Sequence, residues 1–189
     1  MATATKLSPW GKIQTSKTIA DGIEMVSTAS HGGFKLDRKN NAKMPKALRL
    51  PNGWYEEDVE YNRVVIIFPQ FFDQETVKNA HRTIKDYHPQ VYQNWSGQEV
   101  KLEESFVLRR QKFEKENADN YVGMSAFGDW KEGVPKGFVG VFAGKGGRKK
   151  NGEYPEDTKW FLVPSEEYEK RNMFFVIDPT RHEEIKALN

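Results

Sequence analysis

Apolar and polar residues alternate near the start of the chain in a pattern that predicts two strands. Residues 13–19 and 23–29 carry apolar side chains at strand spacing, and Ala20-Asp21-Gly22 between them has the composition of a turn. We therefore expect an N-terminal hairpin that ends at Ser30-His31-Gly32-Gly33. Residues 1–8 precede this pattern, and we expect them to form a flexible tail.

The middle of the chain has apolar residues at helical spacing. Helices are predicted for residues 54–68, 73–87 and 103–117, and a short, irregular one for residues 38–48. Proline and capping residues limit two of these helices. Pro45 shortens the helix over 38–48, and the helix over 73–87 is capped by Asp73 and ended by His88-Pro89.

The final third of the chain changes to short apolar runs separated by Gly and Pro, which is typical of an antiparallel sheet. The expected strands are residues 121–127, 138–143, 159–163 and 173–177. A single helical turn is expected at 164–168, and a final short helix from Asp178. The sequence predicts one α+β domain over residues 9–189, with a mainly antiparallel sheet packed against about three helices.

Composition and charge exclude several classes of protein. The chain of 189 residues has no Cys, which excludes disulfides, thiolate nucleophiles and Cys-ligated metals. A net charge of +2 gives no general attraction to nucleic acid or to anionic membranes. The longest apolar run, Val64 to Phe68, is too short to span a bilayer, and the start lacks a signal peptide. We expect a cytoplasmic protein that does not bind membranes.

A histidine follows the second expected strand and precedes two glycines. The glycines allow a sharp turn of the backbone and leave room beside the imidazole of His31. One hypothesis therefore makes His31 a general acid or base that is oriented by Glu57 or Asp58. These three are the candidate catalytic residues.

Hydroxyl and backbone N–H groups gather around the same turn. They are candidate phosphate-binding or ligand-binding groups, and they belong to Thr28, Ser30, Gly32 and Gly33. An alternative hypothesis gives the segment only a structural role, in which Ser30 closes a turn and His31 hydrogen-bonds a carbonyl. The sequence leaves both hypotheses open.

The acidic run from Glu56 to Glu60 has two interpretations. Carboxylates at helical spacing can hold a divalent cation or orient His31, and they also stabilise the start of a helix. One histidine and a few acidic residues do not define a ligand set, so we assign no metal and no cofactor from the sequence.

A Gly-rich, basic hairpin tip over residues 144–152 is the main candidate for contacts with a macromolecule. The candidate partner-binding residues are its basic side chains and two tryptophans: Lys145, Arg148, Lys149, Lys150, Trp130 and Trp160. The tip lacks the spacing of a phosphate-binding Walker loop. A solvated loop and a packing tryptophan remain alternatives to a binding role.

Several blocks of the sequence resemble one uncharacterised family of phage and plasmid proteins. They are Ser8-Pro9-Trp10-Gly11, Ala20-Asp21-Gly22-Ile23, Ser27 to Leu36, Gly53 to Asp58, Phe161 to Pro164 with Glu167-Tyr168, and Val176 to Pro179 with Arg181-His182. The resemblance carries no activity, because the family is a domain of unknown function. It implies a setting in mobile elements, where small accessory proteins often counter host defences.

These observations lead to one expected function and two alternatives. We expect a non-enzymatic accessory protein of a mobile element that binds a host macromolecule, for example a defence protein. One alternative is a small enzyme or phosphate-binding protein centred on His31. The other is nucleic-acid binding through residues 145–150, which the near-neutral charge does not favour.

Overall fold

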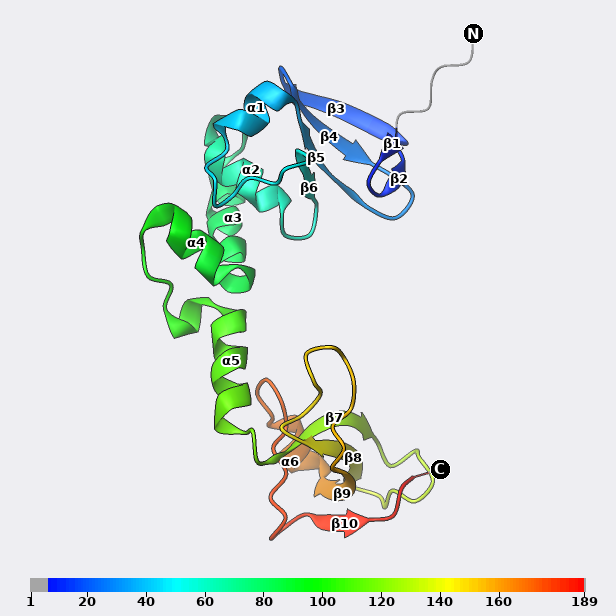
Figure 1. Ribbon diagram of the computed structural model, residues 1–189. Coiled ribbons are helices and arrows are strands. Elements are labelled where there is room, and N and C mark those ends of the chain that lie inside the picture. Colours follow the sequence, from blue (N-terminus) through cyan, green and yellow to red (C-terminus); the bar gives the residue numbers. More distant parts are fainter. Residues whose placement is uncertain (1–6, 189) are drawn as a thin grey trace. The chain divides into compact units, whose positions relative to one another are not determined.

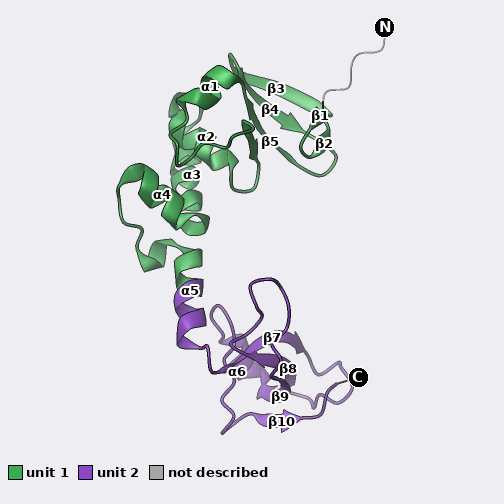
Figure 2. Cartoon of the chain, in the orientation of Figure 1, with its two compact units in different colours: residues 1–109 green, residues 110–189 purple. Residues whose placement is uncertain are grey.

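The computed structural model describes residues 7–188 and confirms the predicted α+β class with antiparallel sheets (Figure 1). The chain forms two compact units, residues 1–109 and 110–189 (Figure 2). The sequence indicates one core, whereas the structure has two hydrophobic clusters, one in each unit. Among the described residues, no helix is long and apolar enough to cross a membrane.

Unit 1 is built on a four-stranded antiparallel sheet in the order β3-β4-β5-β6. The predicted hairpin corresponds to β3 and β4, and β5 continues the meander after the His31 turn. A two-stranded ribbon precedes the sheet and includes residues 7–8 of the expected tail, of which 1–6 lie outside the described residues. The strands are β1 (Leu7–Ser8), β2 (Gly11–Lys12), β3 (Thr15–Ala20), β4 (Ile23–Ser27), β5 (Gly32–Leu36) and β6 (Trp54–Glu56).

One short helix of unit 1 lies between β5 and β6 in the chain, and the others follow β6. The fully buried side chains include Leu48, Tyr55 and Ile84, which come from a loop, a strand and a helix. Burial of such apolar area contributes about 25 cal/mol per Å² to stability. The helices are α1 (Arg38–Lys43), α2 (Tyr61–Ile67), α3 (Gln74–Tyr87) and α4 (Pro89–Ser96), with 3-10 turns at Pro69–Phe71 and Leu102–Glu104. Helix α5 (Phe106–Glu116) begins in unit 1 and continues into unit 2.

The predicted helix over residues 54–68 is wrong in its first half. Residues 54–56 form β6 and pair with β5 in the register Gly33↔Glu56, and the helix begins only at Tyr61. Pairing across the sheet overrides the helical pattern of the apolar residues, because β5 otherwise has a free edge. Because residues 54–56 form a strand and not a helix, Glu56 and Glu57 lie at the His31 turn.

Two prolines mark helix boundaries in different ways. The predicted helix over 38–48 ends at Lys43, and Met44 is extended with ψ 128° because Pro45 follows it. Pro89 ends α3 as predicted, but it also occupies the first turn of a helix absent from the prediction, α4. Proline fits there because the first N–H groups of a helix have no partner inside the helix.

Helix α3 begins where the sequence predicts. The Asp73 carboxylate accepts hydrogen bonds from the Thr76 backbone N–H at 2.8 Å and the Thr76 hydroxyl at 2.7 Å. These bonds satisfy groups that the first turn leaves unpaired, and they lower the pKa of Asp73.

We expect Asp73→Ala to lower the free energy of unfolding by about 1 kcal/mol, because the helix loses its N-cap. Chemical denaturation that follows helical circular dichroism measures the change. Asp73→Asn is the matched control, since an amide oxygen also caps a helix, and it should cost less than half as much. An equal loss for both variants would contradict the capping role.

Unit 2 is built on a second four-stranded antiparallel sheet, in the order β10-β9-β8-β7. One face of this sheet packs on a buried cluster that includes Val141, Phe161 and Val163. The elements are β7 (Tyr121–Phe127), β8 (Phe138–Lys145), β9 (Thr158–Pro164), α6 (Ser165–Glu169) and β10 (Glu183–Ile185).

The end of the chain differs from its prediction. Residues 173–177 do not form a strand and make only an isolated bridge, Val122↔Val176. The expected helix from Asp178 is a turn in which the Asp178 carboxylate accepts from the Thr180 hydroxyl and the Arg181 guanidinium. These bonds lower the pKa of Asp178 to about 2. The fourth strand of the sheet is β10, which pairs with β9 at the edge opposite to β7.

Candidate metal centre

The loop that joins β4 to β5 is a tight turn held by Thr28. The Thr28 hydroxyl donates to the His31 carbonyl at 2.9 Å and accepts from the His31 N–H at 3.1 Å. The backbone N–H of Thr28 also donates to the His31 carbonyl, at 2.7 Å. The threonine, rather than the expected Ser30, therefore closes the turn and fixes the backbone of His31.

Two glycines after His31 allow β5 and β6 to approach closely. A Cβ atom at Gly32 would lie 2.5 Å from Glu57 Oε2. A Cβ atom at Gly33, where φ is +152°, would overlap the Tyr55 carbonyl oxygen and lie 2.7 Å from the Trp10 ring. No other residue type leaves this space, so the glycines bring the end of β6 against the His31 turn.

The buried side chain of Tyr55 fixes the position of β6. Its side chain is fully buried, and its hydroxyl donates to Asn41 Oδ1 at 2.6 Å and accepts from the Leu50 N–H at 3.1 Å. Burial is the largest cause that raises the pKa of Tyr55 above its usual value. The residue next to it, Glu56, is therefore held on a rigid support.

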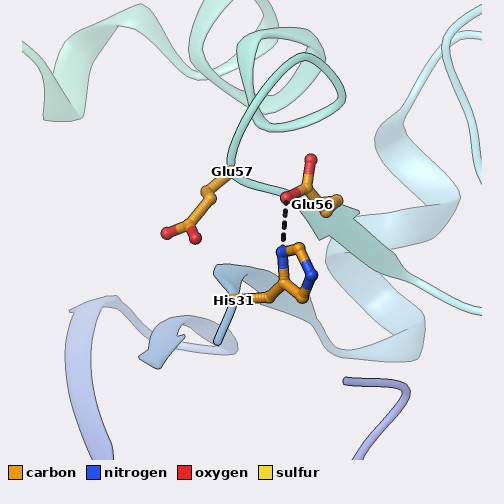
Figure 3. A group of neighbouring side chains, drawn as sticks. All are labelled: His31, Glu56 and Glu57. Atoms are coloured by element: carbon orange, nitrogen blue, oxygen red, sulfur yellow. Dashed lines mark ion pairs between the residues drawn. The ribbon is translucent and has the colours of Figure 1, made fainter. Parts of the chain in front are cut away.

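Side chains of His31, Glu56 and Glu57 converge at this place (Figure 3). His31 Nδ1 lies 3.6 Å from Glu56 Oε1, and one ligand-capable atom from each residue lies within 4.8 Å of the other two. The His31 side chain is 52% exposed and that of Glu56 is 21% exposed, so the group is open to solvent on one side. The imidazole faces two carboxylates and no cation within the group.

The two oxygens of Glu56 have different surroundings. Oε2 accepts a hydrogen bond from the Asp58 backbone N–H at 2.7 Å, which fixes the carboxylate. Oε1, which faces His31, is buried and has no hydrogen-bond partner among residues 7–188. A buried carboxylate oxygen without a partner costs free energy unless a proton or a cation meets it.

The dimensions of the group fit one metal ion. Ligands about 2.1 Å from an ion and about 110° apart lie roughly 3.4 Å from each other, close to the 3.6 Å between His31 Nδ1 and Glu56 Oε1. One ligand-capable oxygen of the exposed Glu57 lies within 4.8 Å of both other ligand atoms. One imidazole and two carboxylates suit Mn²⁺, Fe²⁺ or Zn²⁺.

The structure gathers some predicted site residues and not others. Glu57 lies beside His31 as the catalytic hypothesis requires, whereas Asp58 contributes only its backbone N–H, to Glu56. Among residues 7–188 neither Glu57 nor Asp58 hydrogen-bonds the His31 imidazole, which weakens the acid–base hypothesis, and Glu56 lies 3.6 Å from it. Cavities of about 200 to 490 Å³ open elsewhere in the units, and none of these four is lined by His31.

The Thr28 hydroxyl and the two glycines, among the predicted phosphate-binding groups, are engaged within the fold. The Thr28 hydroxyl holds the turn, and the Ser30 N–H donates to it at 3.4 Å. Gly32 and Gly33 are buried in β5, where Gly33 pairs with both Val26 and Glu56. Carboxylates beside these glycines favour a cation rather than a phosphate.

The predicted partner-binding residues lie in unit 2. Trp160 stands on the face of the sheet opposite the buried cluster, and Trp130 follows β7 with 77% of its surface exposed. Arg148 packs on the Tyr154 ring at 4.4 Å, and Lys149 and Lys150 are exposed at the hairpin tip. Lys145 ends β8 at odd spacing from Phe142, so it lies on the other face.

A family model for a domain of unknown function, DUF7007, matches residues 3–118. The chain belongs to the DUF7007 family. The comparisons with curated proteins and with solved structures gave no match. The DUF7007 match includes all three residues of the candidate metal centre and is consistent with the expected uncharacterised family, whereas the resembling blocks within residues 161–182 lie outside it.

Within the DUF7007 match, Glu56 was predicted only as a member of the acidic run and not among the candidate catalytic residues. Its neighbours Glu57 and Asp58 were chosen because a helix was expected there, and a helix does not place Glu56 opposite Gly33. The run Trp54-Tyr55-Glu56, aromatic and alternating, is itself a short strand signal that indicates β6.

Proposed function

We propose that unit 1 of this DUF7007 protein binds a divalent transition-metal cation through His31 Nδ1 and the carboxylates of Glu56 and Glu57. One observation carries the proposal: Glu56 Oε1 is buried, faces the imidazole and has no hydrogen-bond partner among the described residues. A cation there neutralises the two carboxylates and satisfies this oxygen.

The exposure of the group determines what a bound ion can do. Three protein ligands on one side leave coordination positions open toward solvent, as in catalytic rather than structural sites. A bound ion of this kind polarises a ligand oxygen or lowers the pKa of a bound water. The turn held by Thr28 and the support from Tyr55 fix two of the three ligands before the ion arrives.

Calorimetric titration of the full chain with MnCl₂ and ZnCl₂ tests this function. We expect one site, with affinity at least about tenfold weaker in Glu56→Gln and in His31→Ala. Glu99→Gln is the matched control, because Glu99 is an exposed carboxylate of the same unit outside the group, and it should bind as the wild type does.

Wild-type protein that takes up neither metal would remove the proposal. The same conclusion would follow if Glu56→Gln bound metal with unchanged affinity while retaining its fold by circular dichroism.

We also propose that the protein is an accessory protein of a phage or plasmid, acts in the host cytoplasm, and binds a host macromolecule such as a defence protein. The support is the resemblance of its sequence blocks to mobile-element proteins, together with the exposure of Trp130 in unit 2. Affinity capture from host lysate, with a chain lacking residues 145–152 as the control, tests it. Equal capture by both chains would contradict a role for the hairpin.

A further inference from the structure

Unit 2 carries a row of five aromatic rings, which we call the aromatic strip: Trp130, Phe127, Trp160, Phe142 and Tyr154. Neighbouring ring centroids along the strip lie 6.2, 5.7, 5.1 and 5.3 Å apart. The strip crosses the face of the sheet opposite the buried cluster, from the loop after β7 to the hairpin between β8 and β9. Each ring therefore touches the next without a gap.

The aromatic strip is not the core of unit 2. The buried cluster with Val141, Phe161 and Val163 lies on the opposite face, because side chains alternate along β8 and β9. Trp130 is 77% exposed and Tyr154 is 48% exposed, and the three rings between them are half-buried. Exposed aromatic rings at both ends, joined by partly buried rings, mark a candidate interaction surface.

The central rings present their faces in a similar direction. Phe127 and Trp160 are inclined by 36°, and Trp160 and Phe142 by 34°, whereas the two end rings are steeply turned at 64° and 73°. Rings in such an arrangement form a ridged platform on which flat, unpaired bases can stack. Bases inside a duplex hide their faces and cannot use it.

The charge of unit 2 favours a single strand over a duplex as the bound nucleic acid. Residues 110–189 contain equal numbers of basic and acidic side chains, which disfavours a duplex bound mainly through its phosphates. Three basic residues stand at one end of the strip without a carboxylate within ion-pair distance among the described residues: Arg148, Lys149 and Lys150. They suffice for a few phosphates while stacking supplies the rest of the affinity.

We infer that the aromatic strip binds single-stranded nucleic acid by stacking bases on its rings, with the 148–150 tip contacting the backbone. This inference lies in unit 2 and does not depend on the metal centre. It also gives the expected macromolecular partner a chemical class, which neither the family nor the near-neutral charge supplies.

Titration of the full chain with oligothymidylate dT15, in buffer with EDTA, tests the inference. We expect dT15 to quench tryptophan fluorescence, and Trp130→Ala to bind about tenfold more weakly. The logarithm of the affinity should fall with the logarithm of salt concentration with a slope of about −2, since three cations are available. Duplex dA15·dT15 should bind at least about tenfold more weakly than dT15.

Matched variants separate the strip from general effects. Tyr154→Ala should weaken dT15 binding, whereas Tyr87→Ala, which removes a ring of equal exposure from unit 1, should not. Both tyrosines are about half exposed, so both variants should keep the fold, which circular dichroism checks.

Three results would overturn the inference. They are no binding of dT15 at about 0.1 mM protein, equal affinity for the duplex, and wild-type affinity in a folded Trp130→Ala. Quenching of the tryptophans by a proline-rich peptide but not by dT15 would assign the surface to protein recognition and would equally overturn it. EDTA in every titration removes the metal, so a negative result here leaves the metal proposal untouched.

Discussion

Gly33→Ala is expected to lower the free energy of unfolding of unit 1 by about 3 kcal/mol or more, which corresponds to a fall in melting temperature of roughly 15 °C. The added methyl group overlaps the Tyr55 carbonyl oxygen and presses on the Trp10 ring. Because φ is +152°, the backbone is also strained for any residue with a side chain. Thermal denaturation followed by circular dichroism measures the change.

Gly97→Ala is the matched control for Gly33→Ala. Gly97 ends α4 with φ +70°, and nothing lies within 4 Å of a Cβ atom placed there. Its substitution adds only backbone strain, so we expect a cost of about 1 kcal/mol. Similar costs at both positions would show that β5 and β6 do not approach as closely as the structure indicates.

Phe34→Ala should cost about 3 to 5 kcal/mol, the range of a large aromatic ring truncated in a core. Phe34 is 3% exposed, and its ring centroid lies 5.7 Å from Phe72 and 6.1 Å from Tyr61. The ring joins β5 to the helices behind it, so its loss leaves a cavity between sheet and helix. Urea denaturation at constant temperature gives the difference in unfolding free energy.

Two substitutions control for the loss of Phe34. Phe34→Leu keeps most of the volume and should cost less than about 1.5 kcal/mol. Met25, the cross-strand neighbour of Phe34, is 44% exposed, and Met25→Ala should change stability by less than about 0.5 kcal/mol. Paired residues share a face of the sheet, so an equal loss in Met25→Ala and Phe34→Ala would contradict the different burial of these two side chains on that face.

The sequence predicted correctly the limits of helices and strands that depend on residues close by in the chain. Asp73 and Pro89 limit α3 at the positions expected, and Tyr121–Phe127 is a strand with the predicted ends. These features arise within a few residues, through a cap, a missing N–H or alternating side chains.

Elements that depend on distant residues were predicted less well. Trp54–Glu56 is a strand because β5 accepts it as a partner, and residues 173–177 are not a strand because only Val176 bridges to β7. Helical periodicity near residue 54 and the apolar run near residue 175 contain no information about these partners.

In the candidate metal centre, too, some residues could be predicted from nearby sequence and others depend on strand pairing. His31 was singled out by the glycines after it, and Glu57 by its acidic neighbours, both of which are visible in the sequence. Glu56 joins them only through the register Gly33↔Glu56. The sequence predicted only part of the aromatic strip. Trp130 and Trp160 were candidate partner-binding residues, but the contact of Phe142 with Trp160 and Tyr154 depends on the pairing of β8 with β9.

The contact of Trp10 with Gly33 has an optical consequence. The Trp10 ring, which lies over Gly33, also meets the Trp54 ring edge to face, with centroids 5.6 Å apart and planes at 81°. Two indoles at this separation couple their electronic transitions and give a paired positive and negative band in circular dichroism. Since these rings belong to β6 and to the turn between β1 and β2, that band reports on the support beneath His31, Glu56 and Glu57 without any label.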